Sequence, residues 1–188
     1  MGLLNRLFGR EDAAKTDARR IYTKLMAQSR SPAFFGESRF ADSYDGRIDV
    51  LTLHIAAILS NLNRYGANGE RLGQALFDEM KDDFEIALRE EALSDASVKK
   101  RIQPMISLFY DRVKKYAEAL NQEDVKPALK VVFSETLSVG GTAPQFNDES
   151  APFIDTISTY LLAFDKNLGA ASLGDIALAE FSFPSLGD

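Results

Sequence analysis

The chain contains one histidine, His54, which lies in the apolar stretch RIDVLTLHIAAILSNLNRYG at residues 47–66. Such an imidazole can be a catalytic base, a haem or metal ligand, or a hydrogen-bonded structural residue. Catalysis and metal binding both need a second group to orient the ring or complete the ligand set. No second histidine exists, and Val50 and Leu51 stand one helical turn before His54. The sequence therefore favours a structural histidine at the border of an apolar helix face. A haem carrier with His54 as axial ligand is an alternative.

A second candidate for chemistry is the acidic stretch FDEMKDDFEIALREE at residues 77–91. Four charged side chains share one face of the predicted helix, opposite its apolar face: Asp78, Asp82, Glu85 and Arg89. Carboxylates one turn apart can hold Mg²⁺, and DDFE resembles the Asp-rich motif of helical prenyl-diphosphate enzymes. Those enzymes need a second such motif on a facing helix, which this sequence lacks. We therefore expect a solvated face with a Glu85–Arg89 pair. The alternative is a Mg²⁺-dependent isoprenoid-diphosphate enzyme that uses Asp78 and Asp82.

Composition excludes several other kinds of site. The chain has no cysteine, which rules out disulfides, zinc fingers, iron–sulfur clusters and thiol nucleophiles. It contains no P-loop, dinucleotide-binding glycine motif or G-x-S-x-G motif. With 22 Lys+Arg against 28 Asp+Glu the net charge is −6, which disfavours DNA binding. We therefore expect no catalytic residue, metal or cofactor. A cysteine-free chain without an apolar run of about 18–20 residues is expected in the cytoplasm.

Helical periodicity runs through almost the whole chain. Apolar residues recur at helical spacing in six segments, 12–29, 47–66, 69–91, 94–121, 123–138 and 150–169, and a short helical piece follows Ser172. Asp45 is expected to cap the second segment and Gly66 to end it. Pro104 falls on the polar side of the fourth segment, where we expect a kink or a break. Segments 31–45 and 139–149 are read as loops, and the tail after the last helix as frayed or packed extended chain. These features predict an all-α, single globular domain of six or seven helices.

Two basic regions are candidate contacts with a membrane or a ribosome. Residues 1–11 are expected to form a flexible amphipathic segment ahead of a helical domain at 12–188, with lipid-facing candidates Leu4, Arg6, Leu7, Phe8 and Arg10. The helix predicted at 94–121 carries the second group, which is Lys99, Lys100, Arg101, Lys114 and Lys115. A disordered tail and an ordinary core helix with solvated lysines are the alternatives.

Three blocks of sequence occur in the order and spacing of a known family. They are RIDVLTLHIAAIL, LGQALFDEMKDDFEIALREEALSD and VKKRIQPMISLFYDRVKKYAEAL. Together they resemble the ubiquinol–cytochrome c chaperone family, whose members include the assembly factor for cytochrome b of the bc1 complex. The resemblance is clear over about residues 34–121 and loose in the C-terminal helices. The chain departs from the family pattern at Ile48, at residues 91–95 and at Asp111, and these changes keep the helical pattern.

The resemblance implies a non-enzymatic assembly chaperone that binds newly made cytochrome b during assembly of the bc1 complex (respiratory complex III). It also implies that the protein works at the cytoplasmic face of a membrane, and it leaves open whether the protein contacts the ribosome. We favour a monomer. An apolar groove between helices is expected to hold the client. The predicted client-binding residues come from the matching blocks and are Arg47, Asp49, His54, Asp82, Arg89, Glu90, Tyr110, Arg112 and Tyr116. Asp49, Arg89 and Arg112 are equally expected as internal salt-bridge partners that fix helix packing.

Overall fold

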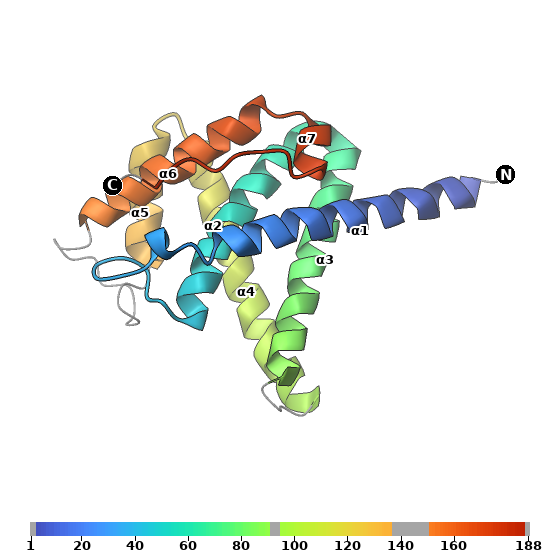
Figure 1. Cartoon of the computed structure of the whole chain (residues 1–188), viewed down its shortest axis with the longest axis horizontal. Coiled ribbons are helices and arrows are strands. Elements are labelled where there is room, and N and C mark those ends of the chain that lie inside the picture. Colours follow the sequence, from blue (N-terminus) through green and yellow to red (C-terminus); the bar gives the residue numbers. More distant parts are fainter. Residues whose placement is uncertain (1–2, 91–94, 137–150, 187–188) are drawn as a thin grey trace.

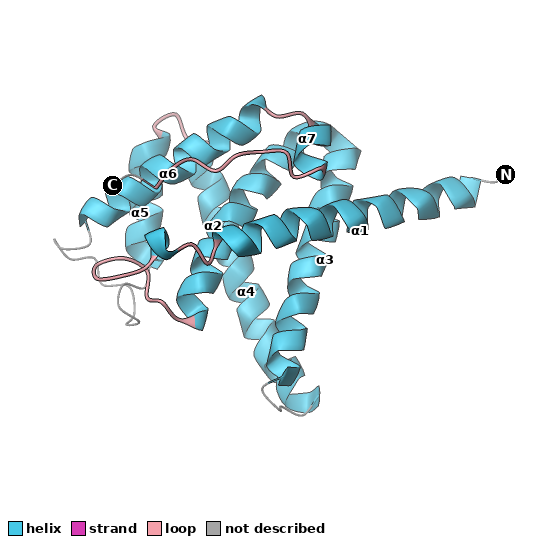
Figure 2. Ribbon diagram, viewed as in Figure 1, coloured by secondary structure: helices cyan, strands magenta, loops and turns pink. Residues whose placement is uncertain are grey.

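The computed structural model describes residues 3–90, 95–136 and 151–186, with side chains from Glu11 onward. These residues form helices and loops without a strand (Figure 2), and Phe35 and Phe40 form an isolated bridge. The helices are α1 (Leu3–Gln28), η1 (Pro32–Phe34), α2 (Tyr44–Leu62), η2 (Asn63–Tyr65), α3 (Gly66–Glu90), α4 (Asp95–Leu120), α5 (Val125–Thr136), α6 (Ala151–Ala170) and α7 (Leu173–Ala177). The predicted all-α fold is confirmed.

Helix α2 lies in the middle of the bundle and packs against α1, α3, α4 and α6. Figure 1 shows α1 crossing the molecule, with its N-terminal part extending beyond the other helices, and α3 and α4 converging toward an end that projects from the bundle. Every side chain of α2 from Asp49 to Ile58 is buried. A helix covered on all sides has no solvated face, so the apolar stripe read from sequence understates how much of it is buried.

The start of α1 and the cap of α2 differ from expectation, and α4 shows one of the two outcomes expected at Pro104 to be wrong, the break. Helix α1 begins at Leu3, nine residues before the predicted start. The side chain that caps α2 is Ser43, whose hydroxyl accepts from the Gly46 amide at 3.2 Å, and Asp45 instead occupies the first turn. Helix α4 continues through Pro104 without a break. Pro104 is exposed, so the disrupted hydrogen bond lies on the solvent side.

Loop residues and the C-terminal tail complete the core. Phe34 and Phe40, from the segment read as a loop, are each 1% exposed. The tail after α7 packs as extended chain, and the rings of Phe181 and Phe183 pack at a tilt against Phe164, with ring-centroid distances of 5.9 and 5.1 Å. Lys24 of α1 holds this tail, because its ammonium donates to the carbonyls of Ala179 and Phe181.

None of the helices in the described ranges is both long enough and apolar enough to span a bilayer.

Candidate functional site

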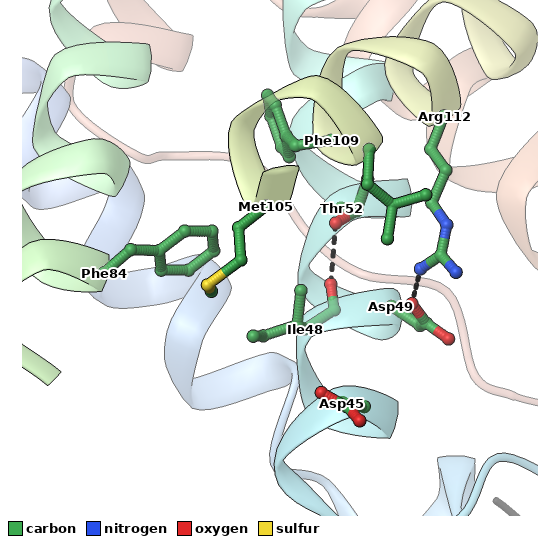
Figure 3. A pocket seen from close by; sticks show the side chains of 9 residues that line it. Asp45, Ile48, Asp49, Thr52, Phe84, Met105, Phe109 and Arg112 are labelled. Carbon is green, nitrogen blue, oxygen red and sulfur yellow. Dashed lines mark hydrogen bonds and ion pairs between the residues drawn. The ribbon is translucent and has the colours of Figure 1, made fainter. Parts of the chain in front are cut away.

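The N-terminal half of α2, the end of α3 and the middle of α4 enclose a cleft of about 230 Å³, which we call the α2–α4 cleft. Its apolar lining consists of Ile48, Phe84, Met105, Leu108 and Phe109, and its polar lining of Asp45, Asp49, Thr52 and Arg112. In Figure 3, Phe84 from α3 and Met105 from α4 point toward each other on one side, with Asp49 and Arg112 on the other. The cleft therefore combines an apolar surface with one charged wall.

The apolar side of the cleft has a buried base and an exposed edge. Phe84 and Phe109 are each 3% exposed, whereas Leu108 is 51% exposed. Phe84 and Phe109 belong to the core-facing stripes of α3 and α4, and the cleft opens where these stripes reach the surface. Leu108 stands beside the stripe of α4, not within it. An apolar group that covered Leu108 would gain about 25 cal/mol for each Å² removed from water.

An ion pair between the Asp49 carboxylate and the Arg112 guanidinium forms the charged wall and joins α2 to α4. The Arg112 side chain is 13% exposed and that of Asp49 is 7% exposed. Arg112 also donates to the Thr136 carbonyl on α5 at 3.4 Å. Burial lowers the pKa of Arg112 from its ordinary value, opposed by the nearby Asp45 carboxylate, and a guanidinium still remains charged at neutral pH. The expectation that Asp49 and Arg112 are internal salt-bridge partners is thus met by the geometry.

His54 is completely buried, so its predicted place at the border of the helix face is wrong. Its Nδ1–H donates to the Val50 carbonyl at 2.6 Å, which leaves Nε2 to accept from the Tyr160 hydroxyl at 2.7 Å. Gln28 in turn donates to that hydroxyl at 3.1 Å. Burial lowers the pKa of His54 to about 4. The ring is therefore neutral with both nitrogens in use, and it reaches neither solvent nor the cleft.

The two predicted tyrosines have contrasting positions. Tyr116 is 3% exposed, its ring packs on Phe133 at 5.2 Å, and its hydroxyl lies 3.4 Å from the Thr136 hydroxyl. Burial raises the pKa of Tyr116. Tyr110 is 53% exposed and lies against Phe77, with ring centroids 4.8 Å apart. Tyr110 alone of the two presents its ring to the surface.

The acidic face of α3 is exposed. Arg89 pairs with Glu85 at 3.5 Å, as the sequence predicted, and lies 3.9 Å from Asp95. The Asp78 carboxylate accepts from the Gln74 amide at 2.9 Å, and Asp82 is also exposed. Among the described residues, no three or more histidine or carboxylate side chains gather in a way that could hold a metal ion.

The remaining predicted residues are dispersed. Arg47 pairs with Asp42 at 2.8 Å and, with Glu90, lines a separate groove between α1, α2 and α3. The side chains of Leu4, Arg6, Leu7, Phe8 and Arg10 lie outside the described residues, as do four of the departure positions, 91–94. The structure therefore brings Asp49 and Arg112 together at the α2–α4 cleft, and the other predicted residues lie elsewhere.

The basic residues of α4 fall into two groups. Lys99, Lys100 and Arg101 are exposed near the start of the helix. Lys114 lies 3.8 Å from Glu118, and Lys115 lies 3.3 Å from Asp111 and 3.9 Å from Glu135. Nearby carboxylates therefore offset the charges of Lys114 and Lys115, whereas Lys99 and Lys100 are more open to an anionic surface.

Two of three comparisons with known proteins found a match. Residues 37–183 match the model of a family described as ubiquinol-cytochrome C chaperone. Among solved structures, the chain matches one titled "Crystal structure of the Cbp3 homolog from Brucella abortus", with 24% sequence identity, a TM-score of 0.79 and coverage of 98% of each chain. At that identity the match shows a shared fold. A search of curated proteins found no match.

Proposed function

This chain belongs to the ubiquinol-cytochrome C chaperone family, and from that premise we propose that it binds newly made cytochrome b during assembly of the bc1 complex and catalyses no reaction. The observation that carries the proposal is the family match, which spans residues 37–183 and so includes α2 to α6 and their cleft.

The α2–α4 cleft is the proposed client site. A membrane-protein segment outside the bilayer exposes apolar side chains, and the surface formed by Ile48, Met105 and Leu108 can remove part of that area from water. The Arg112 guanidinium has five N–H donors, and its contacts with Asp49 and Thr136 leave donors available. We assign these donors to a backbone carbonyl of the client, which would otherwise lose its water.

Attachment to an anionic surface is assigned to the start of α4. Lys99 and Lys100 are exposed there and form no ion pair with the other described residues. Each basic residue near an anionic membrane contributes about 1 kcal/mol, an attraction that salt screens. Lys114 and Lys115 contribute less because carboxylates already lie beside them. Lys99 and Lys100 support our proposal that the chaperone works at the cytoplasmic face of the membrane, where they could also meet the phosphates of a ribosome.

The two alternative functions gain no support from the geometry. The described residues offer no carboxylate cluster facing Asp78 and Asp82, which a Mg²⁺-diphosphate site would need. Haem ligation by His54 would require the Nε2 atom to give up its bond with Tyr160 and the surrounding rings to open.

Affinity purification from solubilised membranes of the native host tests the proposal. We expect tagged protein to recover cytochrome b, and Leu108→Asp to recover much less. Val131→Asp is the matched control, because Val131 is 57% exposed on α5, away from the cleft. A deletion strain with normal cytochrome b levels and normal bc1 activity would contradict the proposal.

A further inference from the structure

A further hollow, which we call the basic pocket, lies where the first turn of α2, the last turns of α3 and the first turns of α4 meet. Its cavity has a volume of about 660 Å³. The apolar side chains that line it are Leu88, Pro104 and Met105, and the polar ones are Tyr44, Asp45, Ser97, Lys100 and Arg101. Leu88 is 5% exposed, whereas Lys100 and Arg101 are exposed. The pocket therefore has a buried apolar base and an open edge with two cations.

Most of this lining comes from one face of α4. Ser97, Lys100, Arg101, Pro104 and Met105 recur at helical spacing, so they lie on one side of the helix. Along this face the two cations stand one turn before the two apolar side chains. Lys100 forms no ion pair with the other described residues. An anionic group bound by Lys100 is thus held next to an apolar surface.

These two kinds of lining fit a ligand in which an anionic group is joined to a hydrocarbon chain. A peptide backbone buried against Leu88 and Met105 would lose its water, and these side chains have no N–H or O–H group to offer in return. A hydrocarbon chain has no polar group to satisfy. An extended polyanion such as RNA needs a row of cations along its backbone, whereas two cations line this pocket and the whole chain carries a net charge of −6.

The acidic residue of the lining, Asp45, has its charge offset by its surroundings. It stands in the first turn of α2, where the N–H groups at the start of a helix favour an anion, and it interacts electrostatically with the Arg112 guanidinium. A phosphate beside Lys100 and Arg101 therefore meets a net positive charge.

We propose that the basic pocket binds one anionic phospholipid molecule, with the phosphate at Lys100 and Arg101 and the first part of an acyl chain against Leu88, Pro104 and Met105. Figure 1 shows α3 and α4 converging toward an end that projects from the bundle, and both helices line the pocket near that end. The inference rests on the proposed attachment of α4 to an anionic surface and adds a defined lipid site to it. Salt screens the attraction to exposed lysines but does not weaken the contact with the acyl chain.

The basic pocket and the α2–α4 cleft are adjacent but can be tested separately. Asp45 and Met105 line both, whereas Lys100 and Pro104 line only the pocket and Leu108 only the cleft. Substitutions at Lys100 and Pro104 therefore test lipid binding without removing the proposed client site.

Four soluble probes test the proposal in titrations of the full chain followed by amide NMR, below the micelle-forming concentration of each probe and at about 150 mM salt. They are dihexanoyl-phosphatidylglycerol, its dibutanoyl analogue, dihexanoyl-phosphatidylcholine and glycerol phosphate. With dihexanoyl-phosphatidylglycerol we expect saturable shifts of the amides around Leu88 and from Ser97 to Met105.

The other three probes separate the contributions of chain and charge. The dibutanoyl analogue should bind about tenfold more weakly, because each methylene withdrawn from water raises the affinity about threefold to fourfold and the longer probe has two more methylenes on each chain. Glycerol phosphate, which has no acyl chain, should bind more weakly still. The net-neutral phosphatidylcholine should bind about threefold to tenfold more weakly than phosphatidylglycerol of the same chain length.

Neighbouring residues of α4 supply matched controls. Lys100→Glu should weaken binding of dihexanoyl-phosphatidylglycerol about fivefold or more. Lys99→Glu makes the same charge change at an exposed position outside the pocket and should change the affinity less than about twofold. Pro104→Asp should remove the advantage of the longer acyl chain, whereas Gln103→Asp, at an exposed position outside the pocket, should keep it.

Four results would overturn the lipid site. Equal losses in Lys99→Glu and Lys100→Glu would show a general attraction to anions and would leave the proposed membrane attachment in place. Equal binding of glycerol phosphate and dihexanoyl-phosphatidylglycerol would reduce the pocket to a phosphate site, and the absence of saturable shifts with every probe would remove it. If Lys100→Glu recovered less cytochrome b but bound phosphatidylglycerol like the wild type, the pocket would belong to the client.

Discussion

Two buried polar side chains of α2, Asp49 and His54, lie in contrasting surroundings. His54 faces α6 and the tail, where Phe164 and Phe183 cover its ring and Tyr160 completes its hydrogen bonds. Asp49 faces α4, where its charge is matched by Arg112 at the edge of the open cleft. One side of α2 is thus closed and electrically neutral, and the other is open and charged.

The difference shows how residue type and surroundings together decide the role of a polar group. A neutral imidazole can be buried once both nitrogens are hydrogen-bonded, whereas a buried carboxylate needs a cation beside it. The single histidine attracts attention in the sequence because of its chemistry, yet its nitrogens are fully used inside the fold. The charged pair draws less attention, yet it borders the cleft that an external segment can enter.

The largest change in the free energy of unfolding is expected for a substitution on the charged side of α2. Arg112→Ala should lower the free energy of unfolding by about 3 kcal/mol or more, because it leaves the buried Asp49 carboxylate without a partner. Urea denaturation measures the change. The double variant Asp49→Leu, Arg112→Leu should be less destabilised than Arg112→Ala, since no uncompensated charge remains. If Arg112→Ala costs less than 1 kcal/mol, the pair is not buried as described.

On the closed side of α2, the contribution of His54 to stability is expected to depend on pH. Burial lowers the pKa of His54 from 6.5 to about 4, so between these values the unfolded state binds a proton that the folded state does not. The contribution of His54 to stability is present above about pH 6.5 and falls by roughly 3 kcal/mol as the pH drops to 4.

NMR can follow this group directly, because an untagged chain contains one imidazole. Its ring signals should stay at their neutral positions down to about pH 5 while the protein is folded. A midpoint near the ordinary value of 6.5 would show that the ring reaches water and would remove the contrast between the two sides.

A smaller change in the free energy of unfolding is expected where the C-terminal tail, the segment after α7, covers the closed side of α2. Lys24→Met removes the ammonium that binds the Ala179 and Phe181 carbonyls and lies 4.5 Å from the Phe181 ring centroid. We expect a loss of about 1–2 kcal/mol, with faster amide exchange confined to the tail and to α6 beneath it. Unchanged exchange in the tail would show that the aromatic rings alone hold it.

The smallest effect is expected at Arg47, two residues before Asp49. Its pair with Asp42 is half exposed on both sides, so Arg47→Ala should change the free energy of unfolding by less than about 1 kcal/mol. The comparison with Arg112→Ala by urea denaturation isolates burial as the cause of the difference. Equal losses in the two variants would contradict this explanation.

The sequence predicted the helices because each has an apolar stripe with the helical period, and the Glu85–Arg89 pair because its partners are four residues apart. It misplaced His54 because its partner Tyr160 and the covering rings of Phe164 and Phe183 come from segments more than a hundred residues away. It predicted a groove between helices but could not place it at α2 and α4, because the angle between helices has no local signal in the sequence. The sequence signal that could have located the cleft is Leu108, an apolar residue beside the apolar stripe of α4.

We propose that the open side of α2 holds cytochrome b. The most direct measurement places the photo-crosslinking residue p-benzoylphenylalanine at position 108, and separately at the control position 131, in cells that are making the bc1 complex. We expect newly made cytochrome b to be crosslinked from position 108 and not from position 131. Absence of cytochrome b from the position 108 product, or equal crosslinking from both positions, would contradict it.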